Sequence, residues 1–329
     1  MTHTSRRDFL SAVAVTTAGA AALGATVPAS AAQAQHTSKA PGQVPGVYRW
    51  TVGAITVTAI ADGYSTLPLA IVPGATPEAA DALAREAFLP TGDLPCIVNT
   101  FVIDTPSKRL LVDTGFGPGP GLHTGKIWEN LTAAGIAPSE IDALVLTHGH
   151  PDHIAGMLTK EGKAAFPNAE LFVHAREHAY WTDDAAQSKA PDFQKGWFDL
   201  FRTSAAAYAK RTTLFDRNDQ EIVSGVRVLE LFGHTPGHSG LHLSDGNQEH
   251  LIWADIVHFP HLQFARPEWG VGFDVDPDLA GKARKTMLDM AATDRIGVSG
   301  MHLAFPAVGH VVTRGKAYAF EQSRWQFDL

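Results

Sequence analysis

Four side chains that can bind metal lie within six residues near the middle of the chain. His148, His150, Asp152 and His153 directly follow a short apolar run that is typical of a buried strand. Side chains two positions apart on an extended segment point the same way, so His148 and His150 could bind one ion. Pro151 is typical of the first turn of a helix, which would present Asp152 and His153 to a neighbouring position. The spacing therefore predicts a metal centre with places for two ions.

Three later segments add metal-binding side chains, and each also follows a strand-like run. His234, Asp255 and His302 come at or just after the ends of three such runs. The carboxyl ends of strands are where α/β proteins gather their sites. A zinc site that performs chemistry usually has three or more protein ligands and one open position. We therefore expect these three side chains to join the ligands of the 148–153 segment.

The composition limits which ligands and partners the protein can use. Its 329 residues are 45% hydrophobic and 18% charged, so the chain can bury a sizeable core. Cys96 is the single cysteine, which excludes an internal disulfide and a cysteine-rich metal site. His, Asp and Glu ligands suit Zn²⁺ as the default, with Mn²⁺, Fe²⁺ and Co²⁺ as alternatives. A formal charge of −8 argues against binding to nucleic acid or to anionic membranes.

The first 34 residues have the layout of an export signal. The pair Arg6-Arg7 precedes an uncharged, alanine-rich stretch and then small residues with Ala-x-Ala spacing. The pair resembles a twin-arginine signal, which implies the Tat export machinery as a partner and a periplasmic or extracellular protein. The stretch is too weakly apolar for a stable membrane anchor. We expect residues 35–45 to be a flexible lead-in and residues 46–329 to form the functional domain.

Strand-like and helix-like segments alternate along the rest of the chain. Apolar runs predict strands within residues 48–61 and 97–113, with a turn at Asp62-Gly63, and helical spacing covers residues 76–88. A second round of strands and helices follows from Leu171 onward. This order predicts an α/β fold. No Pro/Ser-rich linker divides it, so we treat it as one domain.

The order and spacing of the metal-binding residues resemble the metallo-β-lactamase superfamily of binuclear hydrolases. The resemblance covers about residues 45–320 and rests on the 148–153 segment, the Gly-His-Thr-Pro-Gly-His segment 233–238, Asp255 and His302. Within the superfamily, the chain looks closest to methyl parathion hydrolase-like enzymes. The segments that carry this closer likeness are Pro45–Arg49, Ala61–Gly63, Leu111–Gly115, Lys189–Asp192, His302–Pro306 and Gly309-His310. The resemblance implies an αββα sandwich, in which two mixed β-sheets are flanked by helices.

The resemblance also implies a ligand assignment, with one ion on three histidines, a second ion on an aspartate and two histidines, and one carboxylate bridging them. The sets are His148, His150 and His234; Asp152, His153 and His302; and the bridging Asp255. His238 is left out, because the ligand in the family is the histidine followed by threonine. We expect Asp113 to accept a hydrogen bond from a ligand imidazole, with a turn-capping role as the alternative.

Such a centre would make the protein a hydrolase. Two divalent ions can hold a bridging water, lower its pKa and polarise a carbonyl or phosphoryl oxygen. We assign Asp255 and Asp152 to catalysis, and Asp255 could accept the proton of the attacking water. The ligands offer no strong acid for the leaving group, which favours aryl esters, lactones and aryl phosphotriesters. No Gly-x-Ser-x-Gly motif is present, and we expect Cys96 to be a small buried hydrophobe.

The substrate pocket is expected to be apolar. Its candidate walls are aromatic side chains near the ligand segments, namely Phe116, Trp181, Trp197, Phe198, Phe259 and Phe264. We favour a promiscuous hydrolase of esters, lactones and organophosphate triesters. The alternatives are an N-acyl-homoserine-type lactonase, a thioesterase, a β-lactamase and, from another class, an exported metal-binding protein without turnover. The sequence does not determine the physiological substrate or the oligomeric state, for which a homodimer stays open.

Overall fold

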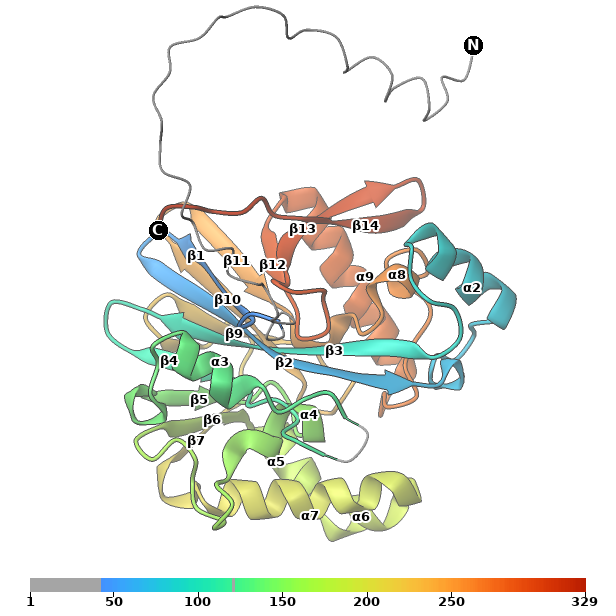
Figure 1. Ribbon diagram of the computed structural model, residues 1–329. Coiled ribbons are helices and arrows are strands. Elements are labelled where there is room, and N and C mark those ends of the chain that lie inside the picture. Colours follow the sequence, from blue (N-terminus) through green and yellow to red (C-terminus); the bar gives the residue numbers. More distant parts are fainter. Residues whose placement is uncertain (1–42, 120–121) are drawn as a thin grey trace, which may run out of the picture. The chain divides into compact units, whose positions relative to one another are not determined.

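Two β-sheets of seven strands each face one another across a shared hydrophobic core (Figure 1). The structure, a computed structural model, describes residues 43–119 and 122–329, of which Val44–Leu329 form one compact unit. The expected export signal and most of the expected lead-in lie outside the described residues. Within the described ranges, no helix is long and apolar enough to cross a membrane.

The first sheet is mixed, with antiparallel pairs from β1 to β4 and parallel pairs from β4 to β7. In spatial order its strands are β1 (Val47–Val52), β2 (Ile55–Leu67), β3 (Leu94–Asp104), β4 (Arg109–Val112), β5 (Ala143–Val145), β6 (Glu170–His174) and β7 (Thr212–Phe215). β5 is apolar and buried along its whole length, as expected of a parallel strand covered on both faces.

The turn expected at Asp62-Gly63 is instead a β-bulge, and β2 continues through it to Leu67. Gly63 has φ +136°, and a side chain there would collide with the carbonyl group of His123. Only glycine fits this close approach of two backbone segments. The expected turn was wrong because a glycine in a strand pattern is compatible with either a turn or a bulge.

The second sheet is also mixed, because β11 and β12 pair parallel while its other neighbours pair antiparallel. In spatial order its strands are β14 (Ala317–Gln322), β13 (Val308–Arg314), β12 (Gly297–Ser299), β11 (Gln248–Ile252), β10 (Ser239–Asp245), β9 (Val226–Glu230) and β8 (Glu221–Val223). The ends of β5, β9, β11 and β12 lead directly into the segments that carry the expected metal ligands.

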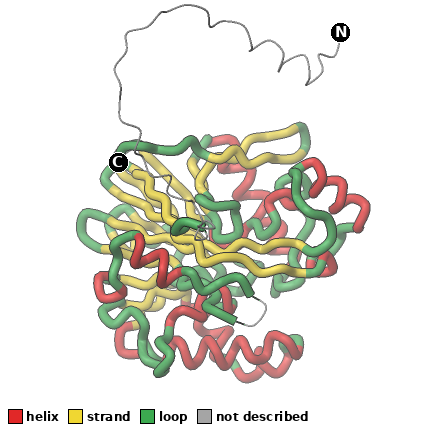
Figure 2. Tube along the Cα trace, viewed as in Figure 1, coloured by secondary structure: helices red, strands yellow, loops and turns green. Residues whose placement is uncertain are grey.

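Helices cover the outer faces of both sheets, so the expected αββα sandwich is confirmed (Figure 2). Leu131 of α3 and Phe201 of α7 pack with residues of the first sheet, and Leu288 of α9 packs with residues of the second sheet. Asp276 caps α9 by accepting a hydrogen bond from the Leu279 N–H at 3.0 Å. The helices are α2 (Pro77–Glu86), α3 (Ile127–Ala133), α4 (Pro151–Ile154), α5 (Ala175–Thr182), α6 (Asp184–Lys189), α7 (Asp192–Ala206), α8 (Pro260–Gln263) and α9 (Pro277–Asp294).

Candidate metal centre

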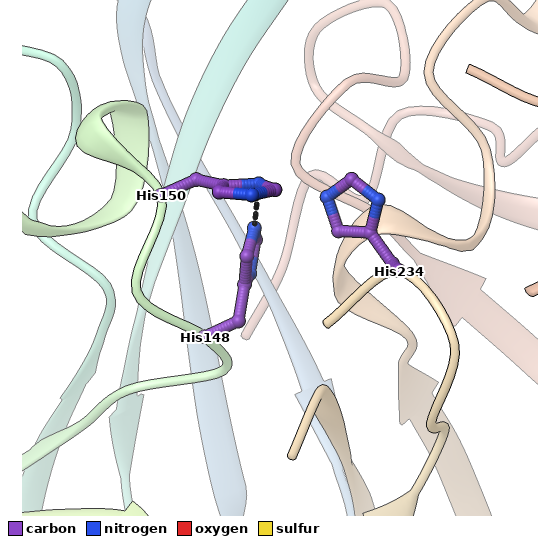
Figure 3. Close-up of side chains that lie close together, drawn as sticks. All are labelled: His148, His150 and His234. Atoms are coloured by element: carbon purple, nitrogen blue, oxygen red, sulfur yellow. Dashed lines mark hydrogen bonds between the residues drawn. The ribbon is translucent and has the colours of Figure 1, made fainter. Parts of the chain in front are cut away.

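The loop after β5 and the loop after β9 bring three histidine rings together. Nε2 of His148 lies 3.0 Å from Nδ1 of His150. His234 enters from the second sheet and faces both rings (Figure 3). One ring nitrogen from each of the three histidines lies within 4.8 Å of the others, which is close enough for a single ion. All three side chains are buried.

A second group of ligand atoms lies beside the first. α4 begins at Pro151, and the helix places Asp152 and His153 next to His302, which follows β12. Oδ2 of Asp152 lies 3.6 Å from Nε2 of His153 and 3.6 Å from Nε2 of His302. The ligand atoms of this group are also within 4.8 Å of one another. The residues expected from distant parts of the sequence therefore meet at one place.

One oxygen of Asp255 lies at the centre of both groups. The distances from Asp255 Oδ2 to histidine Nε2 atoms are 3.6 Å for His148, 3.3 Å for His153, 3.4 Å for His234, 3.1 Å for His258 and 3.0 Å for His302. Oδ1 of Asp255 is buried, and the described residues give it no hydrogen-bond partner. Ala254 directly before it has φ +51°, a left-handed conformation that is uncommon in a residue with a side chain. The carboxylate could therefore serve ligand atoms of both groups.

The hydrogen bond behind the His302 ring determines which of its nitrogens carries the proton. Nδ1 of His302 lies 2.5 Å from the carbonyl oxygen of Ile97. A carbonyl only accepts, so Nδ1 must donate, and Nε2 of the neutral ring is a lone pair. That lone pair points at Asp255 Oδ2, which is itself an acceptor. Two acceptors 3.0 Å apart need a positive charge at the site, from a proton or from a metal ion.

Two other rings are held in the same way. Nδ1 of His153 donates to Oδ2 of Asp113 at 2.7 Å, and Nδ1 of His234 donates to Oδ1 of Asp274 at 2.8 Å. Carboxylates behind ligand histidines fix the ring tautomer and make the opposite nitrogen a better ligand. The freed Nε2 atoms of His153 and His234 are buried and have no hydrogen-bond partner among the described residues. Buried polar atoms of this kind are costly unless something binds them, so these residues fit a pair of divalent ions.

The pKa values of the rings follow the same pattern. Burial by itself lowers the pKa of His302, but the Asp255 carboxylate and the Cys96 side chain together keep that pKa well above its usual value. For His234, burial is opposed by the nearby Asp255 carboxylate and by the hydrogen bond to Asp274, which raise the pKa to about 9. Burial holds the pKa of His148 well below its usual range. The carboxylates thus favour positive charge within the ring cluster, and bound metal ions would provide it.

His238 is placed behind the cluster rather than within it. Its Nδ1 donates to the Leu231 carbonyl at 2.8 Å, and its Nε2 accepts from the Asp255 backbone N–H at 3.1 Å. Both ring nitrogens are therefore engaged, and neither is available to an ion. This is the arrangement expected of a residue that positions Asp255 without being a ligand.

His258 belongs to the cluster, although it is not among the residues predicted from the sequence. Its Nε2 lies 3.1 Å from Asp255 Oδ2, and its ring stacks on His302 with 4.9 Å between ring centroids. Burial lowers the pKa of His258 to about 4, although the Asp255 charge raises it. His258 follows the short turn Ala254–Ile256, after which Val257 is extended, so no helical period in the sequence marks it as a neighbour of Asp255.

A pocket of about 90 Å³, partly open to solvent, lies beside the cluster. Its apolar walls are Leu67, Cys96, Phe116, Pro151, Trp197 and Phe273. Among the six expected aromatics, the structure places Phe116 and Trp197 in these walls. The other four lie in hydrophobic clusters of the interior, namely Trp181, Phe198, Phe259 and Phe264. This difference arises because large aromatic side chains bury the most surface when they enter a core. Phe273, which was not among the six expected residues, lines the pocket instead.

The chain matches known proteins in sequence and in structure. The family model described as the metallo-beta-lactamase superfamily matches residues 93–295. The probable metallo-hydrolase YflN of Bacillus subtilis (strain 168) is 27% identical over 180 residues, which make up 49% of this chain and 61% of that protein. The chain therefore spans about three fifths of the length of that relative.

Two solved structures resemble the whole described fold. The hydrolase AbOPH aligns with a TM-score of 0.81 and 27% identity over 87% of this chain and 100% of that chain. The dizinc quorum-quenching lactonase AidC aligns with a TM-score of 0.79 and 24% identity over 86% of this chain and 99% of that chain, which shows a shared fold. The family model covers more than half of the sequence, and the chain belongs to the metallo-β-lactamase superfamily.

Proposed function

We propose that the protein is a binuclear metal-dependent hydrolase of uncharged esters and lactones, with organophosphate triesters as further substrates. The observation that carries this proposal is the position of Asp255 Oδ2, within 3.6 Å of five histidine Nε2 atoms. A pair of bound divalent ions supplies Lewis acidity and lowers the pKa of water. The first ion would be held by His148, His150 and His234, the second by Asp152, His153 and His302, with Asp255 shared.

The chain's own residues prepare this site in two ways. Asp113 and Asp274 keep protons on Nδ1 of His153 and His234, so that Nε2 is free to bind an ion. Oδ1 of Asp255 has no partner among the described residues, and it is therefore the oxygen that can receive a proton from water. The apolar walls of the pocket limit the access of bulk water to the same place.

The pocket favours substrates without a negative charge. Among the described residues that line it, none is Lys or Arg. The substrates of β-lactamases and of glutathione thioesterases carry carboxylates, for which the described lining of this pocket offers no Lys or Arg side chain. Esters, lactones and triesters need no such partner, and their apolar substituents can contact Phe116, Trp197 and Phe273.

His258 widens the range of leaving groups. It lines the pocket, and its Nδ1 and Nε2 are buried without a directed hydrogen bond in the described part of the chain. A neutral ring there can donate one N–H to a substrate oxygen. The leaving oxygen then does not have to be a stable anion by itself, which favours aliphatic lactones as well as aryl esters. The description of AidC as a lactonase and of AbOPH as a hydrolase agrees with this choice.

A substrate panel on metal-analysed protein tests the proposal. Chelator-treated and Zn²⁺-reloaded samples would be assayed with an acyl lactone, p-nitrophenyl acetate, paraoxon and a β-lactam. We expect metal-dependent turnover of the first two, slower turnover of paraoxon and none of the β-lactam. Equal rates with and without metal on every compound would refute the proposed function and favour a metal-binding protein. Faster turnover of paraoxon than of the lactone would support the methyl parathion hydrolase-like assignment.

We also propose that residues 1–34 direct export through the Tat machinery. The support is the Arg6-Arg7 pair before the alanine-rich stretch. Replacement of both arginines by lysine in the full chain should keep the protein inside cells, whereas the unchanged chain should be found outside the cytoplasmic membrane. Equal distribution of both forms after cell fractionation would contradict this proposal.

A further inference from the structure

We propose that Glu177 is a positioning residue that sets the distance between the two loops which carry the first metal position. The inference rests on the proposed metal centre and adds a residue that neither the motif nor the ligand set contains. Glu177 lies in the first turn of α5, and its side chain is completely buried. Its carboxylate is shared between the loop after β5 and the loop after β9, which belong to different sheets.

Each oxygen of Glu177 accepts two hydrogen bonds. Oε1 accepts from the Gly149 N–H at 2.9 Å and from Nε1 of Trp181 at 2.6 Å. Oε2 accepts from Oγ1 of Thr235 at 2.7 Å and from the Gly237 N–H at 2.8 Å. One oxygen thus holds the β5 loop, and the other holds the β9 loop. The four donors use the full accepting capacity of an ionised carboxylate.

These donors are neighbours of the first set of ligands. Gly149 lies between His148 and His150 in the sequence, and Thr235 directly follows His234. The second set is held by other contacts, such as the hydrogen bonds of Asp113 and of the Ile97 carbonyl. A change at Glu177 should therefore act on the first metal position and spare the second.

The packing around Glu177 shows how close the two loops must come. A side chain at Gly149 would collide with Trp181, and a side chain at Gly237 would collide with the backbone of Glu177. Both glycines let a backbone N–H approach the carboxylate directly. No ion pair to Glu177 occurs among the residues that the structure describes, so the four hydrogen bonds compensate its charge. A buried anion held in this way is sensitive to the loss of any acceptor.

Variants of the protein in which only one of the two metal positions is intact would serve as backgrounds to test the proposal. His302→Ala leaves the first metal position, and His234→Ala leaves the second. Glu177→Gln keeps the length of the side chain but turns one acceptor into a donor that faces the N–H groups. We expect it to raise the Zn²⁺ dissociation constant about 10- to 100-fold in the His302→Ala chain and to change it less than about threefold in the His234→Ala chain. Glu177→Asp, which keeps the charge but loses the reach, should behave like Glu177→Gln.

The matched control is Tyr208→Phe. Tyr208 is also buried, and its hydroxyl joins two segments by accepting from the Phe166 N–H at 3.2 Å and donating to the Met157 carbonyl at 3.0 Å. It should leave both dissociation constants unchanged. If it weakened the first position as much as Glu177→Gln does, a general loss of stability would explain the result and the proposal would be overturned.

Equal effects of Glu177→Gln in both backgrounds, or no effect in either, would also overturn it. If that variant does not fold, Thr235→Val removes one of the four donors and should weaken Zn²⁺ binding only at the first position, by a few-fold. Weaker binding at both positions would overturn the proposal. A full-length protein that binds no metal at all would refute the proposed function. Two ions bound with unchanged affinity in Glu177→Gln would refute only the role of Glu177.

Discussion

Asp113→Asn should weaken the second metal position without removing a ligand. Asp113 is completely buried and accepts three hydrogen bonds, from the Thr147 N–H at 2.9 Å, from Oγ1 of Thr147 at 2.7 Å and from Nδ1 of His153 at 2.7 Å. The amide of Asn can replace only one of the two oxygens. If its oxygen faces the Thr147 N–H, its NH₂ group faces Nδ1 of His153, and two donors oppose each other. His153 must then move its proton to Nε2, which is the atom that would bind the ion.

The size of the effect follows from the lost hydrogen bond. A hydrogen bond to a charged group contributes about 1.5–3 kcal/mol, and every 1.4 kcal/mol changes a binding constant about tenfold. We therefore expect the affinity of the second position to fall about 10- to 100-fold, in agreement with the usual effect of changing a residue behind a metal ligand. The first position, which depends on Asp274 rather than Asp113, should keep its affinity.

Stepwise Zn²⁺ titration against a chromophoric chelator would measure both affinities. Asp274→Asn is the matched variant, because Asp274 holds His234 in the same way at 2.8 Å. If the two carboxylates act on different ions, the effects of the single variants should add in the double variant. An unchanged titration curve for Asp113→Asn, or a double variant no weaker than either single one, would refute the reasoning.

Four further outcomes are expected. Asp255→Asn should give soluble protein with much less bound metal and activity, measured by elemental analysis and ester turnover; two ions with normal turnover would exclude a bridging role. His238→Ala should keep two ions per chain, since both ring nitrogens are engaged elsewhere, and loss of one ion would make His238 a ligand. His258→Leu should keep both ions and reduce lactone turnover more than p-nitrophenyl acetate turnover; an unchanged ratio would remove His258 from contact with substrate. In metal-free protein, the His234 pKa is raised from 6.5 to about 9, so the folded state keeps a proton that the unfolded state loses, and stability should fall as the pH rises from 6.5 to 9. A urea midpoint that rises over this range would contradict that sign.

The metal ligands could be predicted because the sequence features that mark them lie close to each ligand in the chain. A short apolar run ends at Leu146, and the period of an extended chain then places His148 and His150 on the same side. Proline at 151 starts the helix that turns Asp152 and His153 toward the second group. The later ligands follow strand ends, which sheet topology gathers at one edge.

The residues behind the ligands could not be found in the same way. Asp274 lies 40 positions after His234, and Glu177 lies 28 positions after Gly149, so only the packing of α5 and the later loops brings each pair together. A buried carboxylate has no sequence period that marks it. The aromatic residues fail for a related reason, because a local pattern does not tell a pocket wall from a core position. Trp181 illustrates this, since its indole N–H serves Glu177 rather than the pocket.

Because the ligand loops belong to two sheets, the metal centre can be completed only after parts of both sheets have been synthesised. The first sheet is complete at Phe215, when the emerging polypeptide has only four of the seven expected ligands. In the proposed assignment, the first ion would then lack His234, the second ion would lack His302, and the shared carboxylate of Asp255 would not yet have been synthesised. The ligand set of the first ion would be complete only after Asp255 has emerged from the ribosome, and that of the second ion only after His302 has emerged, so metal uptake would come late in the maturation of this protein.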